Sequence, residues 1–304
     1  MLTEHQRLKM LQPPTGPVDL IIDSDTYNEL DDQFAIAYAL LKPEKLNVKA
    51  LYAAPFLNQN SVSPEDGMLK SVEEMHRLLQ LMNMEREVYE GSRNYLPDEQ
   101  TPVLSPAAQD LARRAMQYSS EKPLYLVGIG AITNIASALL INPEIADRIV
   151  IVWLGGHDFG WPDANEFNLR QDVAAARVVF GSGAPLVLMP AQMVTSKFAA
   201  SGPELKYWLS DRNPLCDFLM NKVLDDMEEK YAGTAWSRTI WDVTGIAWPL
   251  GGEGKLVWSR LIPTPLPGYD LKWEFPKDTP LCRYVFHIFR DNLFTDLFKT
   301  LAKQ

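Results

Sequence analysis

Four aspartates within ten residues, placed between an apolar strand and an apolar helix, constrain this chain more than any other part of its sequence. Residues 18–40 read VDLIIDSDTYNELDDQFAIAYAL, which predicts a buried strand followed by a helix with apolar residues at helical spacing. Asp23, Asp25, Asp31 and Asp32 therefore follow the carboxyl end of a strand. Open α/β sheets bind their ligands at this edge, so the acidic turn is the first candidate site.

Four carboxylates in one turn need a compensating partner. A helix N-terminus favours an acidic residue through its dipole and its free N–H groups, but one acid is enough for that purpose. Four carboxylates repel one another unless a cation or hydrogen-bond donors hold them. A solvated acidic loop is the alternative, and the strongly apolar segments on both sides disfavour it. A hard divalent cation with oxygen ligands is the interpretation that fits best.

Composition narrows the class of protein and its setting. The chain has 304 residues, 46% of them apolar, and a mean hydropathy of −0.15, which is typical of a globular protein with a sizeable core. A formal net charge of −10 disfavours a nucleic-acid partner. The two cysteines, Cys216 and Cys282, have no metal-ligand spacing and suit reduced thiols. With neither a signal-peptide core nor an apolar run of membrane-spanning length, the sequence predicts a cytoplasmic protein without a membrane partner.

Expected strands and helices alternate along most of the chain, which predicts an α/β fold. We expect an open, mostly parallel, doubly wound sheet with helices on both faces and an added helical lobe. The whole chain, 1–304, is predicted to form a single domain. Within it, 1–17 is an N-terminal arm, 202–240 is the helical lobe, and 255–304 is a divergent segment that mixes β-like runs with a final helix.

Five segments, in order, resemble the nucleoside hydrolase family, the inosine–uridine preferring hydrolases. They are DSDTYNELDD at 23–32, GAITNIASALLINPEI at 130–145, IVWLGGH at 151–157, EFNLRQDVAAARVVF at 166–180 and WDVTGIA at 241–247. The first is two residues longer than the DxDxxxDD pattern of that family, and the last stands where the family usually has HDPxA. The resemblance extends over about residues 18–250 and implies the fold and chemistry of a nucleoside hydrolase.

The resemblance implies one Ca²⁺ per chain. The ligands that match are Asp25, Asp32, Asp242 and the backbone carbonyl of Ile129. Oxygen-only ligation from separate strand ends suits Ca²⁺. Asp242 can also be the N-cap of the helix that follows it, and Ile129 can be simply a buried strand residue. Either structural role is compatible with metal binding.

The implied reaction is hydrolysis of the N-glycosidic bond of a ribonucleoside, or of a related N-riboside, to free base and ribose. Metal-bound water would attack the sugar, with Asp25 as the general base. Asp31, Glu166 and Asn168 match residues that hydrogen-bond the sugar, and Asn165 joins the expected substrate contacts. The alternative for this segment is a loop with a helix N-cap. Phe167 is expected to anchor the segment while its two polar neighbours turn the other way.

The chain departs from the family pattern on the side of the acidic turn. The inserted Asn28 and Glu29 lengthen that turn, and Asn28 is predicted to add a substrate contact. An early asparagine that the family has after its second strand is without a clean match, and Asn58 and Asn60 are the candidates.

The base side also departs from the pattern. Trp241 stands where many members have a histidine that can protonate the leaving base; an indole N–H cannot do so, but the ring can stack on a base. His157, after Gly155 and Gly156, is an alternative site residue, and a loop histidine satisfied by the backbone is an equal interpretation. Trp161 and Trp248 are expected to be packing residues.

Two rival functions stay open from the sequence. A haloacid-dehalogenase-like phosphatase would use Asp23 as a covalent nucleophile. A catalytically inactive nucleoside- or ribose-binding protein is the other rival, and the retained aspartates argue against it. The expected partner in every case is a small molecule, and a homodimer or homotetramer is possible.

Overall fold

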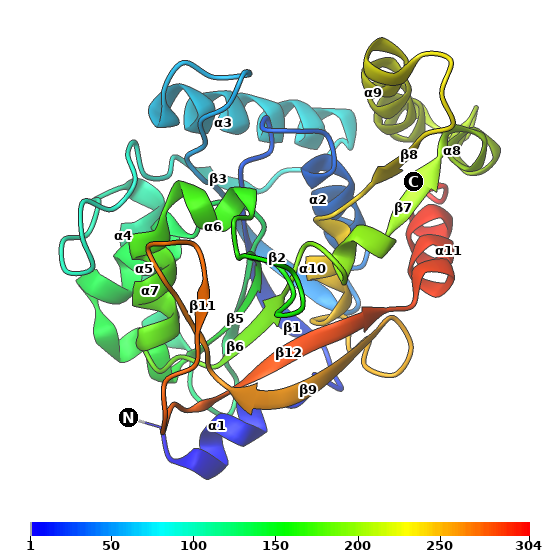
Figure 1. The fold of residues 1–304 in the computed structure, drawn as a ribbon. Coiled ribbons are helices and arrows are strands. Elements are labelled where there is room, and N and C mark those ends of the chain that lie inside the picture. The colour runs from blue at the N-terminus through cyan, green and yellow to red at the C-terminus, as the bar shows by residue number, and fades with distance from the viewer. Residues whose placement is uncertain (1) are drawn as a thin grey trace.

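An eight-stranded sheet with helices on both faces forms the centre of the molecule, as a computed structural model of residues 2–304 shows (Figure 1). The strand order is β3-β2-β1-β4-β5-β6-β12-β9. Only the last pair, β12 and β9, is antiparallel. These strands are β1 (Val18–Ser24), β2 (Leu46–Ala53), β3 (Glu87–Tyr89), β4 (Leu124–Gly128), β5 (Ile149–Leu154), β6 (Leu186–Met189), β9 (Val257–Pro263) and β12 (Leu281–Ile288). The predicted open, mostly parallel α/β sheet is therefore confirmed.

The helices form one layer on each face of the sheet, each over its own buried apolar cluster. The layer on one face consists of α2 (Asp32–Leu40), α3 (Pro64–Leu81), α10 (Val243–Ala247) and α11 (Arg290–Leu301). The layer on the other face consists of α4 (Pro106–Arg114), α5 (Thr133–Ile141) and α7 (Val173–Gly181). The shorter elements outside these layers are α1 (Glu4–Met10), α6 (Phe167–Gln171), and the 3-10 turns η1 (Ala115–Gln117), η2 (Pro143–Asp147) and η3 (Thr195–Lys197).

Burial on both faces explains why the central strands are continuous apolar runs. Every residue of β4, β5 and β6 is buried, as parallel strands covered by helices require. All nine residues of α2 are buried as well, because it lies between the sheet and the outer helices α3, α10 and α11. A helix that is apolar all round is stable only in such a position.

The strand order reverses between β1 and β4, which is the topological switch point of the sheet. From β1 the chain proceeds outward through β2 and β3, whereas β4, β5 and β6 are added on the other side. The carboxyl ends of β1, β4, β5 and β6 lie at one edge, where the acidic turn and Ile129 emerge. Ligands of open α/β sheets bind at such a point.

The segments after β6 extend this framework. Residues 202–240, for which a helical lobe was predicted, contain α8 (Gly202–Leu209) and α9 (Pro214–Tyr231). They end in a strand, β8 (Ser237–Thr239), that pairs antiparallel with β7 (Ala199–Ser201). The C-terminal segment contributes β9, β12 and α11, and a small hairpin of β10 (Leu266–Pro267) and β11 (Trp273–Glu274).

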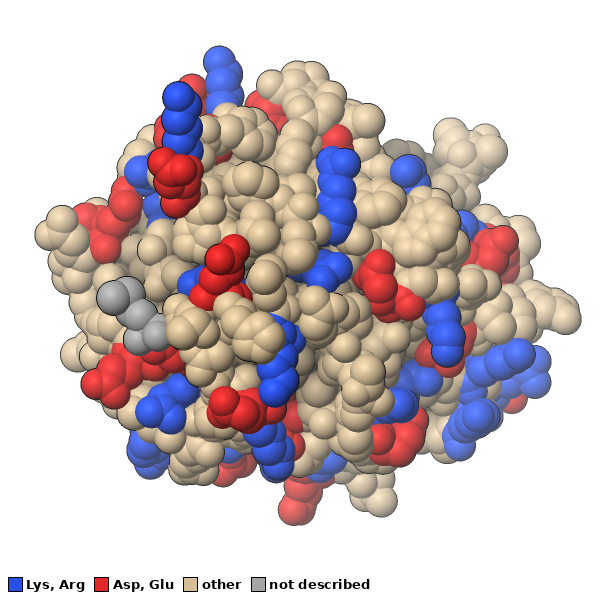
Figure 2. All heavy atoms as spheres, turned by 90° about the horizontal axis from the view of Figure 1, so that it is seen from below, with Lys and Arg blue, Asp and Glu red and all other residues tan. Residues whose placement is uncertain are grey.

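The surface carries charges of both signs. On the face seen in Figure 2, Lys and Arg side chains are interspersed with Asp and Glu rather than gathered into a patch of one sign. Among residues 2–304, no helix combines the length and the apolar character needed to cross a bilayer.

Candidate active site

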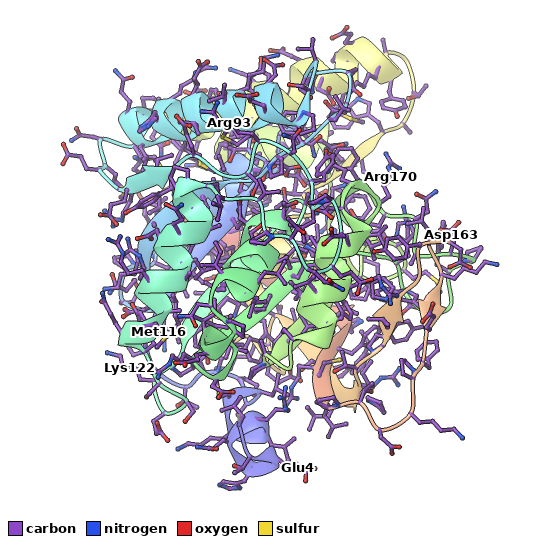
Figure 3. The ribbon with its side chains drawn as sticks, turned by 90° about the vertical axis from the view of Figure 1, so that its left-hand side faces the viewer. Glu4, Arg93, Met116, Lys122, Asp163 and Arg170 are labelled. Atoms are coloured by element: carbon purple, nitrogen blue, oxygen red, sulfur yellow. The ribbon has the colours of Figure 1, made fainter. Side chains whose placement is uncertain are left out.

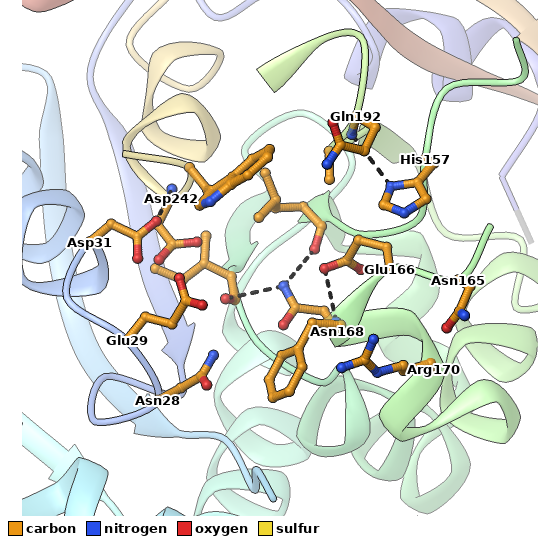
Figure 4. Close-up of a pocket in the computed structure, with 15 residues that line it drawn as sticks. Asn28, Glu29, Asp31, His157, Asn165, Glu166, Asn168, Arg170, Gln192 and Asp242 are labelled. Atoms are coloured by element: carbon orange, nitrogen blue, oxygen red, sulfur yellow. Dashed lines mark hydrogen bonds between the residues drawn. The ribbon is translucent and has the colours of Figure 1, made fainter. Parts of the chain in front are cut away.

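A pocket of about 240 Å³ opens at the carboxyl edge of the sheet (Figure 4). Its lining comes from the acidic turn, from the ends of β4, β5 and β6, from α6 and from the start of α10. The lining residues are Asn28, Glu29, Asp31, Ile129, Leu154, His157, Asn165, Glu166, Phe167, Asn168, Arg170, Ala191, Gln192, Trp241 and Asp242. Every predicted substrate-binding residue is among them, so tertiary structure brings together segments that are far apart in sequence.

Three carboxylates converge at one end of this pocket. Asp31, Asp32 and Asp242 are all buried and each can place a carboxylate oxygen within 4.8 Å of the others. The backbone N–H of Asp242 donates to Asp31 Oδ2 at 3.4 Å, and Ser24 Oγ donates to Asp32 Oδ1 at 2.5 Å. This group could hold a metal ion. Asp31 was expected to contact the sugar rather than to belong to the metal group.

Burial and mutual repulsion make these acids reluctant to ionise. Burial raises the pKa of Asp32 to about 8 and that of Asp31 to about 6, and neighbouring carboxylates add to both shifts. Burial, followed by the charges of Asp31 and Asp32, raises the pKa of Asp242 well above its usual range. Because a cation would reverse these shifts, the cluster has the electrostatics of a cation site.

Asp25 is 1% exposed and is not among the residues that line the pocket. Neither Oδ1 nor Oδ2 has a hydrogen-bond partner among residues 2–304. Burial, followed by the charge of Asp32, raises the pKa of Asp25 well above its usual range. A side chain at Gly130 would place its Cβ 3.0 Å from Asp25 Oδ1, so glycine keeps this space open. Two buried oxygens without partners next to a carboxylate cluster are the arrangement that a bound cation would satisfy.

The Ile129 carbonyl is held at the same edge by Asn168. Asn168 Nδ2 donates to Ile129 O at 3.3 Å and to Leu154 O at 3.0 Å, so it ties the ends of β4 and β5 together. Asn168 is 4% exposed and lines the pocket. Its amide oxygen has no protein partner in residues 2–304 and remains able to accept a hydrogen bond from a ligand.

Glu166 has the N-cap role that the sequence offered, and it also lies in the pocket lining, while its contact with a sugar stays a prediction. At the N-terminus of α6, its carboxylate accepts N–H bonds from Gly156, Asn168 and Leu169 at 2.9–3.0 Å. Burial outweighs these bonds and raises its pKa to about 7. The expectation that Phe167 anchors the segment is wrong: Phe167 is half-buried and lines the pocket.

The inserted turn residues form one wall of the pocket. Asn28 is held by both candidate asparagines: Asn58 Nδ2 donates to Asn28 Oδ1 at 2.5 Å, and Asn60 Nδ2 donates to Asn28 O at 2.8 Å. Neither Asn58 nor Asn60 lines the pocket, so their role here is to support the insertion. Glu29 forms an ion pair with Arg238 of β8.

The remaining wall carries His157, Gln192 and Trp241. His157 is half-buried, and its Nδ1 accepts a bond from the backbone N–H of Gln192 at 3.4 Å. Burial lowers its pKa. Trp248 is a fully buried core residue, as expected. Trp161 is 41% exposed, meets the His157 ring edge-on and is not among the residues that line the pocket.

Comparison with known sequences places this arrangement in a family. The sequence model of the inosine-uridine preferring nucleoside hydrolases matches residues 20–255. The chain belongs to this nucleoside hydrolase family. It is 28% identical over 258 residues to the pyrimidine-specific ribonucleoside hydrolase RihA of Salmonella arizonae, with 77% of this chain and 80% of that protein covered. RihA of Escherichia coli O1:K1 is 28% identical over 262 residues, with the same coverage.

Solved structures with the same fold can be superposed on nearly the whole of this chain. The plant nucleoside hydrolase PpNRh1 has a TM-score of 0.76 at 20% identity and covers 95% of this chain and 100% of its own. The type III effector protein XopQ, complexed with adenosine diphosphate ribose, has a TM-score of 0.71 at 16% identity and covers 99% of both chains. These likenesses show that the fold is shared.

Two motif residues of this hydrolase-family chain have structural roles that the sequence did not reveal. Asn134 Nδ2 donates to Asp23 Oδ1 at 2.8 Å and to Ala53 O at 3.1 Å, so it links β1, β2 and α5. Asp172 accepts bonds from Thr133 Oγ1 at 2.7 Å and from the Leu96 N–H at 2.9 Å. Asp23 is buried and outside the pocket lining, as Asp25 is, and its Oδ1 accepts the bond from Asn134.

Proposed function

We propose that this protein hydrolyses the N-glycosidic bond of ribonucleosides, or of a related N-riboside, in a calcium-dependent reaction. Family membership supports N-glycosidase chemistry at the level of the reaction class. The observation that carries the proposal is the buried group of Asp31, Asp32 and Asp242 at one end of a pocket that both polar and apolar side chains line. A pocket with convergent polar groups and perturbed pKa values is the usual setting of an enzyme active site.

Asp25, Asp32, Asp242 and the Ile129 carbonyl would hold the Ca²⁺, with Asp31 beside them. The donor set consists of oxygen atoms only, and the two partnerless oxygens of Asp25 are available to it. When bound, the ion would lower the pKa of water in the site and neutralise the carboxylates.

The side chains of the chain itself would orient the substrate and move the proton. Asp25 would accept the proton of the attacking water, whose oxygen bonds to C1′ as the bond from C1′ to the base nitrogen breaks. Asp31 and the free amide oxygen of Asn168 would accept hydrogen bonds from sugar hydroxyls. Trp241 would stack on the base, and the departing base would take a proton from solvent.

Release of free base and ribose tests this proposal. The purified protein with Ca²⁺ is incubated with inosine, uridine and cytidine, and base is measured by chromatography and ribose by a reducing-sugar assay. Because the RihA relatives are named pyrimidine-specific hydrolases, the two pyrimidine nucleosides are necessary members of the panel. Asp25→Asn should lower kcat by about 10²–10⁴-fold. Asp19→Asn, a change at the other end of β1 and outside the pocket, is the matched control.

Other outcomes would identify the rivals. Phosphate release from sugar phosphates without base release from any nucleoside would favour a phosphatase. Saturable ribose binding without turnover would favour a binding protein. Full activity after removal of Ca²⁺ by a chelator would contradict the metal dependence.

A further inference from the structure

The hairpin of β10 and β11 lies in the part of the chain beyond the family match, which extends over 20–255, yet it reaches the wall of the pocket. On one side it packs against α7, where Arg177 Nη1 donates to a backbone carbonyl of the hairpin at 2.9 Å. On the other side, Figure 3 shows Asp163 beside its pale orange strands. The backbone N–H of the next residue, Ala164, donates to Leu271 O at 2.7 Å. The hairpin is therefore fixed between α7 and the loop that follows β5.

Trp273 of β11 makes the central contact with that loop. It is half-buried, and its Nε1 donates to the backbone carbonyl of His157 at 2.9 Å. Its ring meets the Phe159 ring edge-on, with 5.6 Å between the centroids. Tyr284 of β12 adds to this connection, because its hydroxyl donates to Asp158 and its ring stacks on Phe159 at 4.6 Å. Three consecutive loop residues are thus held by side chains from the C-terminal segment.

The Trp273 ring also lies directly against Gly156. A Cβ on Gly156 would lie 2.4 Å from Trp273 Cζ2, and the φ angle of Gly156 is +68°, so this position requires glycine. The N–H of Gly156 donates to Glu166 Oε2 at 3.0 Å, and its carbonyl accepts from the N–H of Ala191 at 2.8 Å. Glu166 and Ala191 both line the pocket, whereas Trp273 is not among the lining residues. Trp273 therefore acts on the wall through the residues that it contacts.

The contacts of His157 fix its ring as well as its backbone. Its Nδ1 accepts the N–H of Gln192 at 3.4 Å, and the Trp161 ring meets the imidazole edge-on at 5.7 Å between centroids. A neutral imidazole that accepts at Nδ1 carries its proton on Nε2, so His157 is a hydrogen-bond donor in the pocket lining. Figure 4 shows His157 and Glu166 on the same wall. A shift of the loop would therefore displace both groups.

We infer that Trp273 is a positioning residue of the pocket: it holds His157, and through Gly156 it holds Glu166, where these two side chains meet the substrate. The inference rests on the proposed function for the identity of that substrate. Asp31 and Asp242 lie across the pocket from His157 and come from the acidic turn and the start of α10 (Figure 4). The candidate metal group therefore does not depend on the contacts that Trp273 makes.

This separation provides the test. Trp273→Phe keeps an aromatic ring beside Gly156 and removes the N–H that the His157 carbonyl accepts. By calorimetry on the calcium-loaded protein, ribose should bind about tenfold more weakly to Trp273→Phe, which is the size of one lost hydrogen bond. The Kd for Ca²⁺ should not change. The kcat/KM for a nucleoside should fall by about tenfold or more, because small displacements of positioned groups are costly.

Trp258→Phe is the matched control, since it makes the same exchange in the edge strand β9, outside the pocket, and should leave all three quantities unchanged. If Trp273→Phe does not fold, Tyr284→Phe, which removes only the hydroxyl bound to Asp158, supplies the test on the same readouts. There too, weaker ribose binding with unchanged Ca²⁺ binding is expected, and unchanged ribose binding would overturn the inference.

Two results with Trp273→Phe would overturn the positioning role. A lower Tm with parental ribose affinity and kcat/KM would show that Trp273 only packs, and an equal loss of Ca²⁺ and ribose affinity would show a general loosening of the fold. Parental hydrolysis by the variant would leave the proposed function intact. Weaker ribose binding by the variant, together with no base release from any nucleoside by the parent, would support the positioning role and overturn the proposed function.

Discussion

Asp32→Asn is expected to stabilise the protein in the presence of a chelator and to abolish its stabilisation by Ca²⁺. Asp32 is 1% exposed and lies within 4.8 Å of two further carboxylates. Asparagine has nearly the same shape, and its Oδ1 can still accept the bond from Ser24 Oγ. The substitution therefore removes a charge and one ligand atom while it leaves the packing of α2 in place.

The size of the effect follows from two independent considerations. Two unit charges 4.8 Å apart repel by about 3.5 kcal/mol at an effective dielectric constant of about 20. A shift of the Asp32 pKa from 3.8 to about 8 corresponds to about 6 kcal/mol, at about 1.4 kcal/mol per pH unit. Relaxation of a charged cluster lowers such figures, so we expect a gain of at least about 2 kcal/mol in the metal-free protein at pH 8. That gain corresponds to a rise in Tm of about 4 °C.

The sign of the pH dependence is fixed by the direction of the shift. Between pH 3.8 and about 8 the folded protein retains a proton on Asp32 that the unfolded chain has lost. The free energy of unfolding of the metal-free parent therefore falls as pH rises through this window. Asparagine does not titrate, so the advantage of Asp32→Asn should be small at pH 5 and greatest at pH 8.

Thermal unfolding followed by circular dichroism at pH 5, 6.5 and 8, with chelator or with Ca²⁺, measures these effects. Ca²⁺ at 100 times its Kd should stabilise the parent by about 2.7 kcal/mol and the variant far less. A variant that is less stable than the parent in chelator at pH 8, or that Ca²⁺ stabilises as much as the parent, would refute the reasoning.

Three further predictions concern the pocket. The 2′-deoxy analogue of a good substrate should react about 10⁴-fold more slowly in kcat/KM, because a site built to pair a hydroxyl leaves polar groups unpaired without it; equal rates would contradict this. Asn168→Ala should lower both kcat and Ca²⁺ affinity, since the Asn168 amide of the parent holds the carbonyls of Ile129 and Leu154. Steady-state kinetics with a Ca²⁺ titration would detect either change. Purine ribosides should react faster than uridine, because Trp241 replaces the family histidine and cannot protonate the leaving base. Trp241→Ala should slow inosine more than a nitrophenyl riboside, whose leaving group needs no proton. If uridine is the best substrate, His157 becomes the candidate acid instead.

The class of fold and the edge of the sheet at which the candidate site lies could be predicted from local sequence patterns. Alternating apolar strands and helices specify a mostly parallel sheet, because each pattern records which faces of its own element are buried. The acidic turn after β1 then marks the binding edge, since a parallel sheet places all its carboxyl ends together. The motifs from residues 23–32 to 241–247 also sufficed for the family, which the match over 20–255 confirms.

Only the tertiary structure decided which of these residues meet and what each one does. Asp31 joins Asp32 and Asp242 across a separation of 211 residues, and Asn168 reaches Ile129 across 39. Phe167 faces the pocket, although its sequence context suggested an anchor. A pattern within one segment reports the burial of that segment, whereas contacts between segments depend on how the sheet orders its strands.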